Sequence, residues 1–160
     1  LMWDIKRFFP KEYEAGLYAN ELLSSYLGQE LPNDEAGFMA LTLVNSELNH
    51  QNSNARDLTQ LMEEIMTIVK YSLEIPLEQD DVYVQRFITY LKFFCERILT
   101  NTKQEELDDS LMFDLMCQKY PVEYETTKKI ALHLEKTRHY SISDDEQLYL
   151  TIHLSRIRKK

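Results

Sequence analysis

Apolar residues recur at steps of three and four along most of this chain, which is the spacing of one face of an α-helix. The clearest stretch runs from Leu58 to Leu73 and ends before Pro76. A second apolar stripe covers roughly residues 80–100. Its members are Val82, Phe87, Ile88, Leu91, Phe94, Cys95 and Ile98. These two patterns predict two long amphipathic helices.

Three further helices are expected after residue 100. The third ends before Pro121, the fourth covers roughly residues 122–137, and the fifth begins at Ser143. Ser143 and Glu146 form the Ser-x-x-Glu pattern of a capping box, in which each residue satisfies a free amide of the other. Residues 57–160 are therefore predicted to form an all-α domain of five helices.

Part of this pattern occurs twice. The segment LPNDEAGFMALTL begins at Leu31, and ISDDEQLYLTIHL begins at Ile142, 111 positions later. FPKEYE, from Phe9, and YPVEYE, from Tyr120, are also 111 positions apart. LMWDI at the start of the chain matches LMFDL, 110 positions later. A period this long is that of a duplicated small domain, not of a solenoid repeat.

The two copies are unequal, because nothing precedes LMWDI whereas a helix pair precedes LMFDL. We therefore expect a first domain truncated at its N-terminus, represented by its last three helices in residues 1–50. A polar linker is expected at residues 51–56, followed by the complete second domain in residues 57–160. Within the repeated segment, a polar residue stands among aliphatic ones, and it is Thr42 in the first copy and His153 in the second.

Composition narrows the possible functions. The net charge of −9 makes this part of the protein a poor nucleic-acid partner, since phosphate contacts need clustered lysines and arginines. The chain has only 3 glycines and 4 prolines, and this scarcity argues against an all-β fold with many turns. No apolar run is long enough to cross a membrane, and no signal peptide is evident. Two cysteines inside apolar helical patterns are read as free thiols, which favours a cytoplasmic protein.

No enzyme, metal or cofactor signature is present. The four histidines include no pair at i,i+4, and no phosphate-binding loop or nucleophile motif occurs. The acidic pairs Asp34-Glu35 and Asp145-Glu146 fall at predicted helix starts, where negative charge stabilises the helix. We therefore predict a protein that is not an enzyme.

His153 is the residue with the most distinctive chemistry. It lies between Ile152 and Leu154, and Tyr149 and Arg156 share its helix face. One interpretation is a half-buried structural histidine. The other is a phosphorylation site, at which a neutral ring becomes an anion and Arg156 serves as its counter-ion.

The phrases LPNDEAGFMALTLVNSELN, IVKY, RFITYLKFF and ISDDEQLYLTIHLSRI resemble the phosphotransferase-system (PTS) regulation domains of bacterial transcriptional antiterminators of the BglG/LicT/SacY type. The resemblance implies a homodimer whose separate N-terminal domain, missing here, binds an RNA antiterminator hairpin. It also implies that HPr or a sugar-specific enzyme II phosphorylates histidines in the regulation domains. Those phosphates would shift the dimer between active and inactive states.

The resemblance also assigns individual positions. A family acceptor position in the first domain falls at Thr42, in ALTLVN, and one in the second domain falls at Ser72, after IVKY. The late acceptor of the second domain, in LTIH, is kept as His153. The resemblance therefore implies that one visible phosphoacceptor remains, and that Thr42 and Ser72 substitute the others.

Two alternatives stay open. With two acceptor positions substituted, the domains could form a dimerisation module that is insensitive to phosphorylation. The same kind of regulation domain also occurs in DNA-binding transcriptional activators. The N-terminal domain would distinguish that class from an RNA-binding antiterminator.

Overall fold

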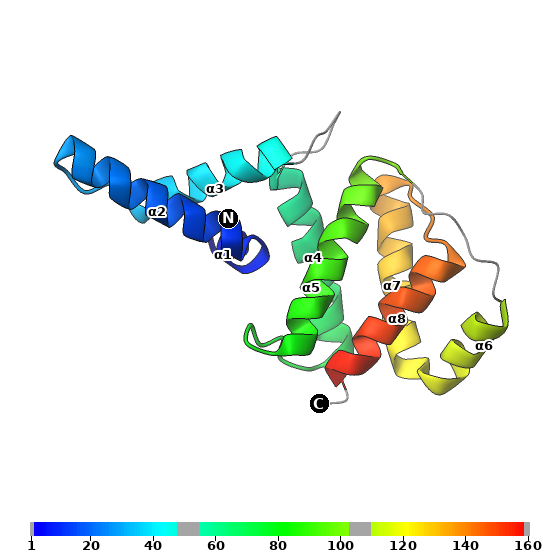
Figure 1. The fold of residues 1–160 in the computed structure, drawn as a ribbon. Helices are drawn as coiled ribbons and strands as arrows, with labels where there is room; N and C mark the ends of the chain where they lie inside the picture. The colour runs from blue at the N-terminus through cyan, green and yellow to red at the C-terminus, as the bar shows by residue number, and fades with distance from the viewer. Residues whose placement is uncertain (1, 48–54, 103–109, 159–160) are drawn as a thin grey trace. The chain divides into compact units, whose positions relative to one another are not determined.

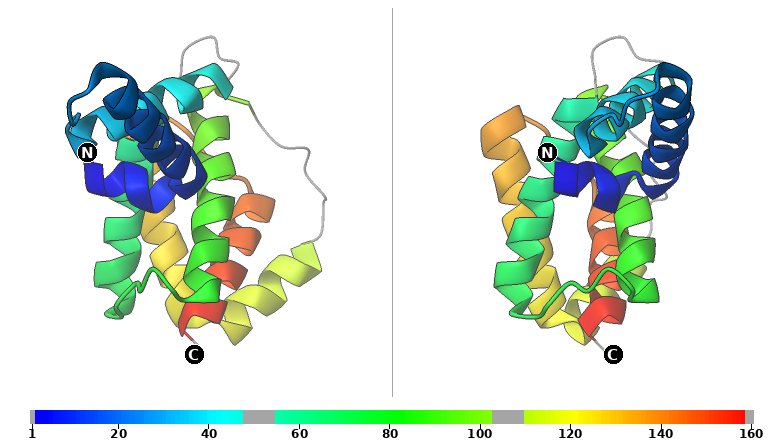
Figure 2. Two further views of the ribbon diagram at one scale, coloured as in Figure 1. Left: turned by 60° about the vertical axis from the view of Figure 1, so that its left-hand side comes forward. Right: turned by 90° about the vertical axis from the view of Figure 1, so that its left-hand side faces the viewer.

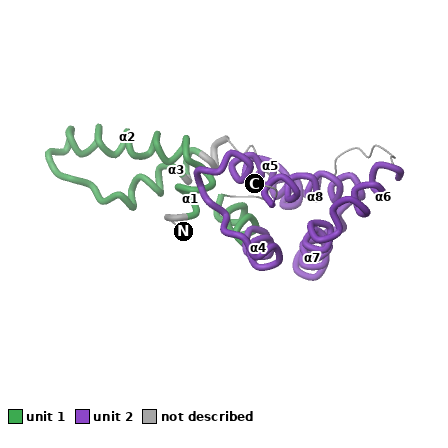
Figure 3. The backbone as a smooth tube through the Cα atoms, turned by 90° about the horizontal axis from the view of Figure 1, so that it is seen from below, with its two compact units in different colours: residues 1–63 green, residues 64–160 purple. Residues whose placement is uncertain are grey.

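The computed structural model describes residues 2–47, 55–102 and 110–158, and every regular element within them is an α-helix (Figure 1). The chain divides into two compact units, residues 1–63 and 64–160 (Figure 3). The expected all-α fold is confirmed for the described residues.

The first unit contains α1 (Met2–Phe8), α2 (Pro10–Leu27) and α3 (Asn33–Glu47). Helices α2 and α3 lie side by side, and α1 contacts both (Figure 1). The closest approach is at Gly16 of α2, where a Cβ atom would overlap the carbonyl oxygen of Ala36 in α3. Glycine is therefore required here for close helix packing.

Helix α4 (Ala55–Leu73) passes from the first unit into the second. It already includes Ala55 and Arg56, so the helix begins inside the segment 51–56 that was expected to be a linker. Residues 51–54 lie outside the described part of the chain. Leu73 is followed by Glu74 in the left-handed region, with φ of 54°, and the helix ends there, just before Pro76 as predicted.

The second unit continues with α5 (Val82–Leu99), α6 (Ser110–Lys119), α7 (Pro121–Arg138) and α8 (Asp144–Arg158). Helix α8 contacts α5, α6 and α7 (Figure 2). Seen end-on, α5 and α8 form one layer and α7 and the C-terminal half of α4 form another (Figure 3). The five predicted helices are confirmed.

The predicted capping box at the start of α8 is also confirmed. The Glu146 amide donates a hydrogen bond to Ser143 Oγ at 3.1 Å, and the Ser143 amide donates to Glu146 Oε1 at 3.3 Å. The Glu146 carboxylate additionally accepts a hydrogen bond from the Tyr140 hydroxyl at 3.3 Å. Glu146 in this first turn thus serves helix capping, as the sequence indicated.

The sequence repeat has a structural counterpart. Helices α2 and α7 both start with proline, and the residues before them, Phe9 and Tyr120, have nearly identical φ and ψ of −129°, 60° and −126°, 60°. Both helices end in a left-handed residue, Gly28 with φ of 71° and His139 with φ of 52°. These two residues are again 111 positions apart, so the capping geometry is conserved between copies although glycine is not.

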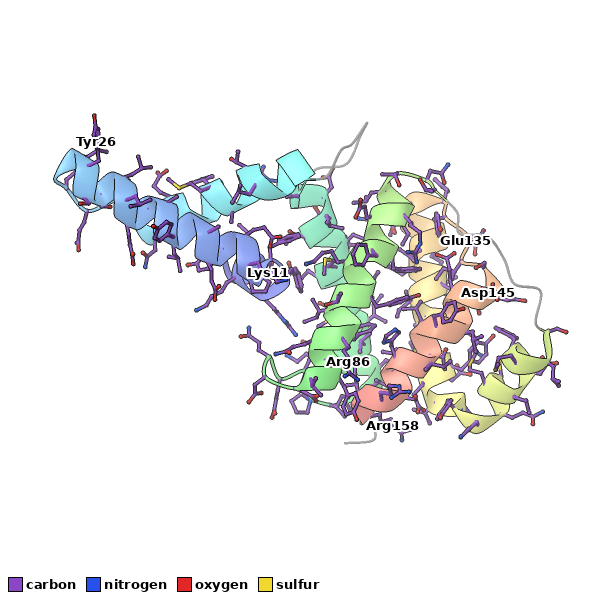
Figure 4. The ribbon with its side chains drawn as sticks, in the orientation of Figure 1. Lys11, Tyr26, Arg86, Glu135, Asp145 and Arg158 are labelled. Atoms are coloured by element: carbon purple, nitrogen blue, oxygen red, sulfur yellow. The ribbon has the colours of Figure 1, made fainter. Side chains whose placement is uncertain are left out.

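The first unit leaves more of the repeated apolar face exposed than the second does. Leu23 and Leu43 are 41% and 39% exposed, whereas Leu134 and Leu154, 111 positions later, are fully buried. Tyr26, at the far end of α2, also extends into solvent (Figure 4). The three helices α1–α3 therefore bury less of this face than the five-helix unit does.

Candidate phosphorylation site on the last helix

Helix α8 places His153 at the edge of its buried face. Its neighbours Thr151 and Leu154, two positions before and one position after it in the sequence, are fully buried in the second unit. Thr151 is fixed against α7, because its hydroxyl oxygen lies 2.7 Å from the hydroxyl oxygen of Thr127. This packing fixes the rotation of α8 about its axis and leaves His153 half-buried.

Two aromatic rings from α5 contact the imidazole. Tyr90 stacks on His153, with ring centroids 4.5 Å apart and planes inclined by 25°. Phe87 lies 6.4 Å away, centroid to centroid, at an angle of 48°. These contacts hold one face of the imidazole against an apolar wall.

The surroundings of His153 favour its neutral form. Burial lowers the pKa of the imidazole, and the positive charge of Arg156 lowers the pKa further. Neither ring nitrogen forms a hydrogen bond with any residue that the structure describes. At neutral pH the ring therefore carries an unprotonated nitrogen that is available as a nucleophile.

The cations near the end of α8 have different roles. Arg158 Nη1 donates to Glu123 Oε1 at 3.1 Å, so that guanidinium is already paired (Figure 4). Arg156 is exposed and forms no ion pair with the described residues. Arg156 is close enough to lower the pKa of His153, and its role as the counter-ion of a phosphate stays a prediction.

Tyr90 is a site residue that sequence reasoning missed, because an aromatic residue in an amphipathic helix is normally expected to belong to the core. Its hydroxyl is buried and lacks a hydrogen-bond partner among the described residues. Burial raises the pKa of this phenol, and the charge of Arg97 partly opposes the rise. The apolar stripe over residues 80–100 predicted the helix that carries Tyr90, but periodicity does not say which helix its buried face meets.

Ser72 occupies a different environment from His153. Its hydroxyl oxygen lies 2.7 Å from that of Thr126 and accepts a hydrogen bond from Lys129 Nζ at 3.2 Å, so it faces α7. His153 instead faces α5. The two positions that the resemblance assigned to the second domain therefore share no contact in the structure.

Thr42 lies in the first unit on α3. Its side chain is exposed, and the hydroxyl donates to the carbonyl oxygen of Phe38, one turn earlier, at 3.0 Å. This is the ordinary bond of a threonine to its own helix. Among the residues that the structure describes, the Thr42 hydroxyl has no hydrogen-bond partner outside α3.

Comparison with known proteins agrees with the repeated architecture. Residues 1–46 and 63–157 each match the PRD domain family. The chain belongs to the PRD domain family. Residues 47–62 fall between the matched segments and contain the predicted linker at 51–56.

Curated PRD proteins similar to this chain carry names that describe transcriptional regulators. The chain is 41% identical to "Transcription antiterminator LicT" of Bacillus subtilis (strain 168), with 100% of the chain and 57% of that protein aligned. It is 38% identical to the "Beta-glucoside operon antiterminator" of Dickeya chrysanthemi, with 100% and 56% aligned. It is 26% identical to the "PtsGHI operon antiterminator" of Bacillus subtilis (strain 168), with 99% and 56% aligned.

The chain therefore spans little more than half the length of these relatives. The resemblance to antiterminator regulation domains is confirmed by both comparisons. Within residues 2–47, 55–102 and 110–158, no helix is long and apolar enough to cross a membrane. No cluster of three or more histidine, cysteine or acidic side chains suited to a metal ion occurs in the same residues.

Proposed function

We propose that this chain is the regulatory module of a sugar-responsive bacterial transcriptional antiterminator, controlled by phosphorylation of His153. The PRD domain family and the antiterminator relatives support the regulatory role. The observation that carries the proposed site is a neutral, half-buried imidazole with no hydrogen bond to a described residue, on the same helix face as the exposed Arg156. HPr or a sugar-specific enzyme II is the proposed phosphoryl donor.

The chemical step is a transfer between proteins. The unprotonated nitrogen of His153 forms a bond to phosphorus as the bond between phosphorus and the donor breaks. The product carries a multiply charged phosphoryl group on a ring that was neutral and packed against Tyr90 and Phe87. An anion of that charge is costly beside aromatic faces and is stabilised by Arg156. We therefore expect phosphorylation to weaken the stack and to draw the guanidinium toward the phosphate.

The proposed output is a change in a homodimer. A near-complete shift between two states needs about 5.5 kcal/mol of differential stabilisation. Charge-assisted hydrogen bonds contribute roughly 1.5–3 kcal/mol each, so a few of them at one interface suffice. The RNA antiterminator hairpin would be bound by the separate N-terminal domain, consistent with the net charge of −9 on this chain.

A second function is a dimerisation module that does not respond to phosphate. The stack of Tyr90 on His153 favours it, because the ring already has a structural role in packing α5 against α8. The presence of Thr42 and Ser72, which cannot form phosphohistidine, at the other assigned acceptor positions also favours this second function. The two functions differ in whether His153 accepts phosphate from a physiological donor.

The distinguishing experiment is a phosphotransfer assay with phosphoenolpyruvate, enzyme I and HPr, with and without enzyme II. Intact mass is read under conditions that preserve phosphohistidine. One added phosphate that is lost in His153→Ala supports the switch. No added phosphate with any donor supports the dimerisation module.

A further inference from the structure

Helices α5 and α8 run in opposite directions, and two polar contacts join them about two helical turns apart (Figure 1). The first is the stack of Tyr90 on His153. The second joins Arg97, seven residues after Tyr90, to Glu146, seven residues before His153. Arg97 Nη2 lies 4.0 Å from Glu146 Oε2, and we call these two residues the α5–α8 ion pair. Neither the PRD assignment nor the proposed phosphorylation site uses this pair.

Glu146 is held firmly by its surroundings. The residue is 1% exposed. Its carboxylate accepts hydrogen bonds from the Tyr140 hydroxyl and from the Ser143 amide, each at 3.3 Å. A buried carboxylate needs hydrogen bonds and a compensating charge, and Arg97 brings a positive charge to it from α5. Glu146 therefore anchors the Arg97 guanidinium to the first turn of α8.

The guanidinium also adjoins the aromatic stack that ends at His153. Arg97 Cζ lies 5.9 Å from the centroid of the Phe94 ring, within the range of a cation–π contact. Phe94 stacks on Tyr90, with ring centroids 6.0 Å apart and planes inclined by 16°. Phe94 is fully buried, so close packing restricts its movement. One continuous series of contacts thus leads from Arg97 through these two rings to His153.

Packing, and not a hydrogen bond, holds the Tyr90 ring among the described residues. The Tyr90 hydroxyl and Arg97 Nε are both buried without a hydrogen-bond partner in the described part of the chain. Burial raises the pKa of the Tyr90 phenol, and the nearby charge of Arg97 partly lowers it. The position of this ring therefore depends on the neighbours that pack against it, and the guanidinium lies among them.

We propose that the α5–α8 ion pair holds the Tyr90 ring against His153 and so limits how readily a phosphoryl donor reaches the imidazole. Arg97 is a positioning residue, since the contacts that link it to His153 run through Phe94 and Tyr90. The consequence for phosphorylation rests on the proposed function. The coupling of Arg97 to the reactivity of His153 does not rest on it.

A second ion pair of α8 provides a matched comparison. Arg158 Nη1 lies 3.1 Å from Glu123 Oε1, and the Glu123 side chain is 5% exposed. Arg158 is only five residues from His153 in the sequence. This pair joins α8 to α7, whereas Arg97 belongs to the helix that carries the aromatic stack. General loss of an α8 ion pair can therefore be separated from loss of the one beside the stack.

The test compares two double variants of the full chain. Arg97→Gln/Glu146→Gln removes the α5–α8 ion pair, leaves no unpaired buried charge, and keeps the capping box, in which Gln can replace Glu. Arg158→Gln/Glu123→Gln makes the same chemical change in the control pair, and both variants keep the net charge of the wild type. Arg97→Lys is a further variant that keeps the charge but loses the planar group over Phe94. Circular dichroism verifies that each variant is folded.

The reactivity of His153 is measured with diethyl pyrocarbonate, a small reagent that modifies unprotonated imidazole, and is followed by peptide mass mapping. We expect Arg97→Gln/Glu146→Gln to react at least about fivefold faster than the wild type, and Arg97→Lys to be faster as well. The control variant should react within about twofold of the wild type. The pH profile of the rate should move to higher pH in the first variant, because a less enclosed imidazole has a higher pKa.

The Tyr90→Ala background tests whether the coupling passes through the Tyr90 ring. There the substitutions at Arg97 and Glu146 should change the rate by less than about twofold, because the ring that they hold is gone. A full effect in this background would overturn the proposal, as would equal acceleration in the control variant or none in the folded variants at Arg97. Acceleration of this reaction without phosphate transfer from any protein donor would support the inference and overturn the proposed function.

Discussion

Tyr90 of α5 stacks on His153 of α8, with ring centroids 4.5 Å apart and the ring planes 25° from parallel. The contact joins the residue with the most distinctive chemistry in the chain to a buried phenol. It ties the protonation state and the accessibility of His153 to the packing of α5. The predictions for the site follow from this pair.

Removing the Tyr90 ring should release His153. In Tyr90→Ala the imidazole loses one apolar wall, so we expect the pKa of His153 to rise toward its ordinary value and phosphorylation to become faster. An NMR titration of the imidazole measures the pKa. Tyr90→Phe is the control, because it keeps the stack and removes a buried hydroxyl without a hydrogen-bond partner among the described residues. An unchanged pKa in Tyr90→Ala would show that the stack does not desolvate the ring.

Protonation of His153 should cost stability in mild acid. The pKa of this ring is lowered in the folded chain, so below about pH 6.5 the unfolded chain binds a proton that the folded chain resists. The free energy of unfolding should therefore fall as pH decreases from about 6.5. The check is urea unfolding of the wild type and His153→Gln at several pH values. The wild type should lose more stability than the variant between pH 8 and pH 5.5, and parallel pH profiles would contradict the account.

The fork between Glu64 and Arg138 should be the strongest ion pair joining α4 to α7. Both Glu64 oxygens accept from one guanidinium, and the side chains are 26% and 22% exposed. We expect Glu64→Gln to reduce the free energy of unfolding by about 2 kcal/mol at pH 7. Because the pKa of Glu64 is lowered, this stabilisation should be present above about pH 4.5 and be lost as pH falls through the folded pKa.

The control for this prediction is the exposed pair of Glu125 and Lys128, whose charged atoms are 2.6 Å apart. Glu125→Gln should cost clearly less than Glu64→Gln, since solvent screens exposed pairs on a helix. A similar cost for both substitutions in chemical denaturation would mean that the fork is also screened.

Replacing Gly16 by alanine should lower the stability of the first unit, although alanine is the better helix former. Alanine is favoured over glycine in a helix interior by about 1 kcal/mol, yet a Cβ at this position would overlap the Ala36 carbonyl. Separating α2 from α3 should outweigh the propensity and give a net loss of roughly 1–3 kcal/mol. Hydrogen exchange of α2 and α3 locates the effect. Ser25→Ala, at an exposed position on α2, is the control and should be neutral or stabilising.

The helices themselves could be predicted from sequence, because each has a local signal. Pro121 starts α7, and Ser143 with Glu146 caps α8, as the pattern indicated. The start of α4 was less clear, since Ala55 and Arg56 close a polar stretch of sequence and yet belong to the helix. Local patterns define where a helix lies, and they define its end less well.

The contacts of the site could not be predicted, because they depend on which helix faces pair. The sequence predicted the helices that carry Tyr90 and His153, but the stacking of these rings follows from the packing of α5 against α8. For the same reason Lys129 of α7 donates a hydrogen bond to Ser72 of α4, 57 positions earlier, without any sequence signal. His139 is a further example, since its left-handed conformation is visible only through its repeat equivalent, Gly28.

The most direct test of the central proposal is a site-resolved phosphorylation measurement. The chain is labelled with ¹⁵N-histidine, and the four rings, His50, His133, His139 and His153, are assigned with single His→Gln variants. Phosphoenolpyruvate, enzyme I and HPr are then added, with and without enzyme II. The account predicts that the ring nitrogens of His153 alone shift to phosphohistidine values, and that His133→Gln responds like the wild type. Phosphorylation of another histidine, or no shift at His153 with any donor, would contradict it.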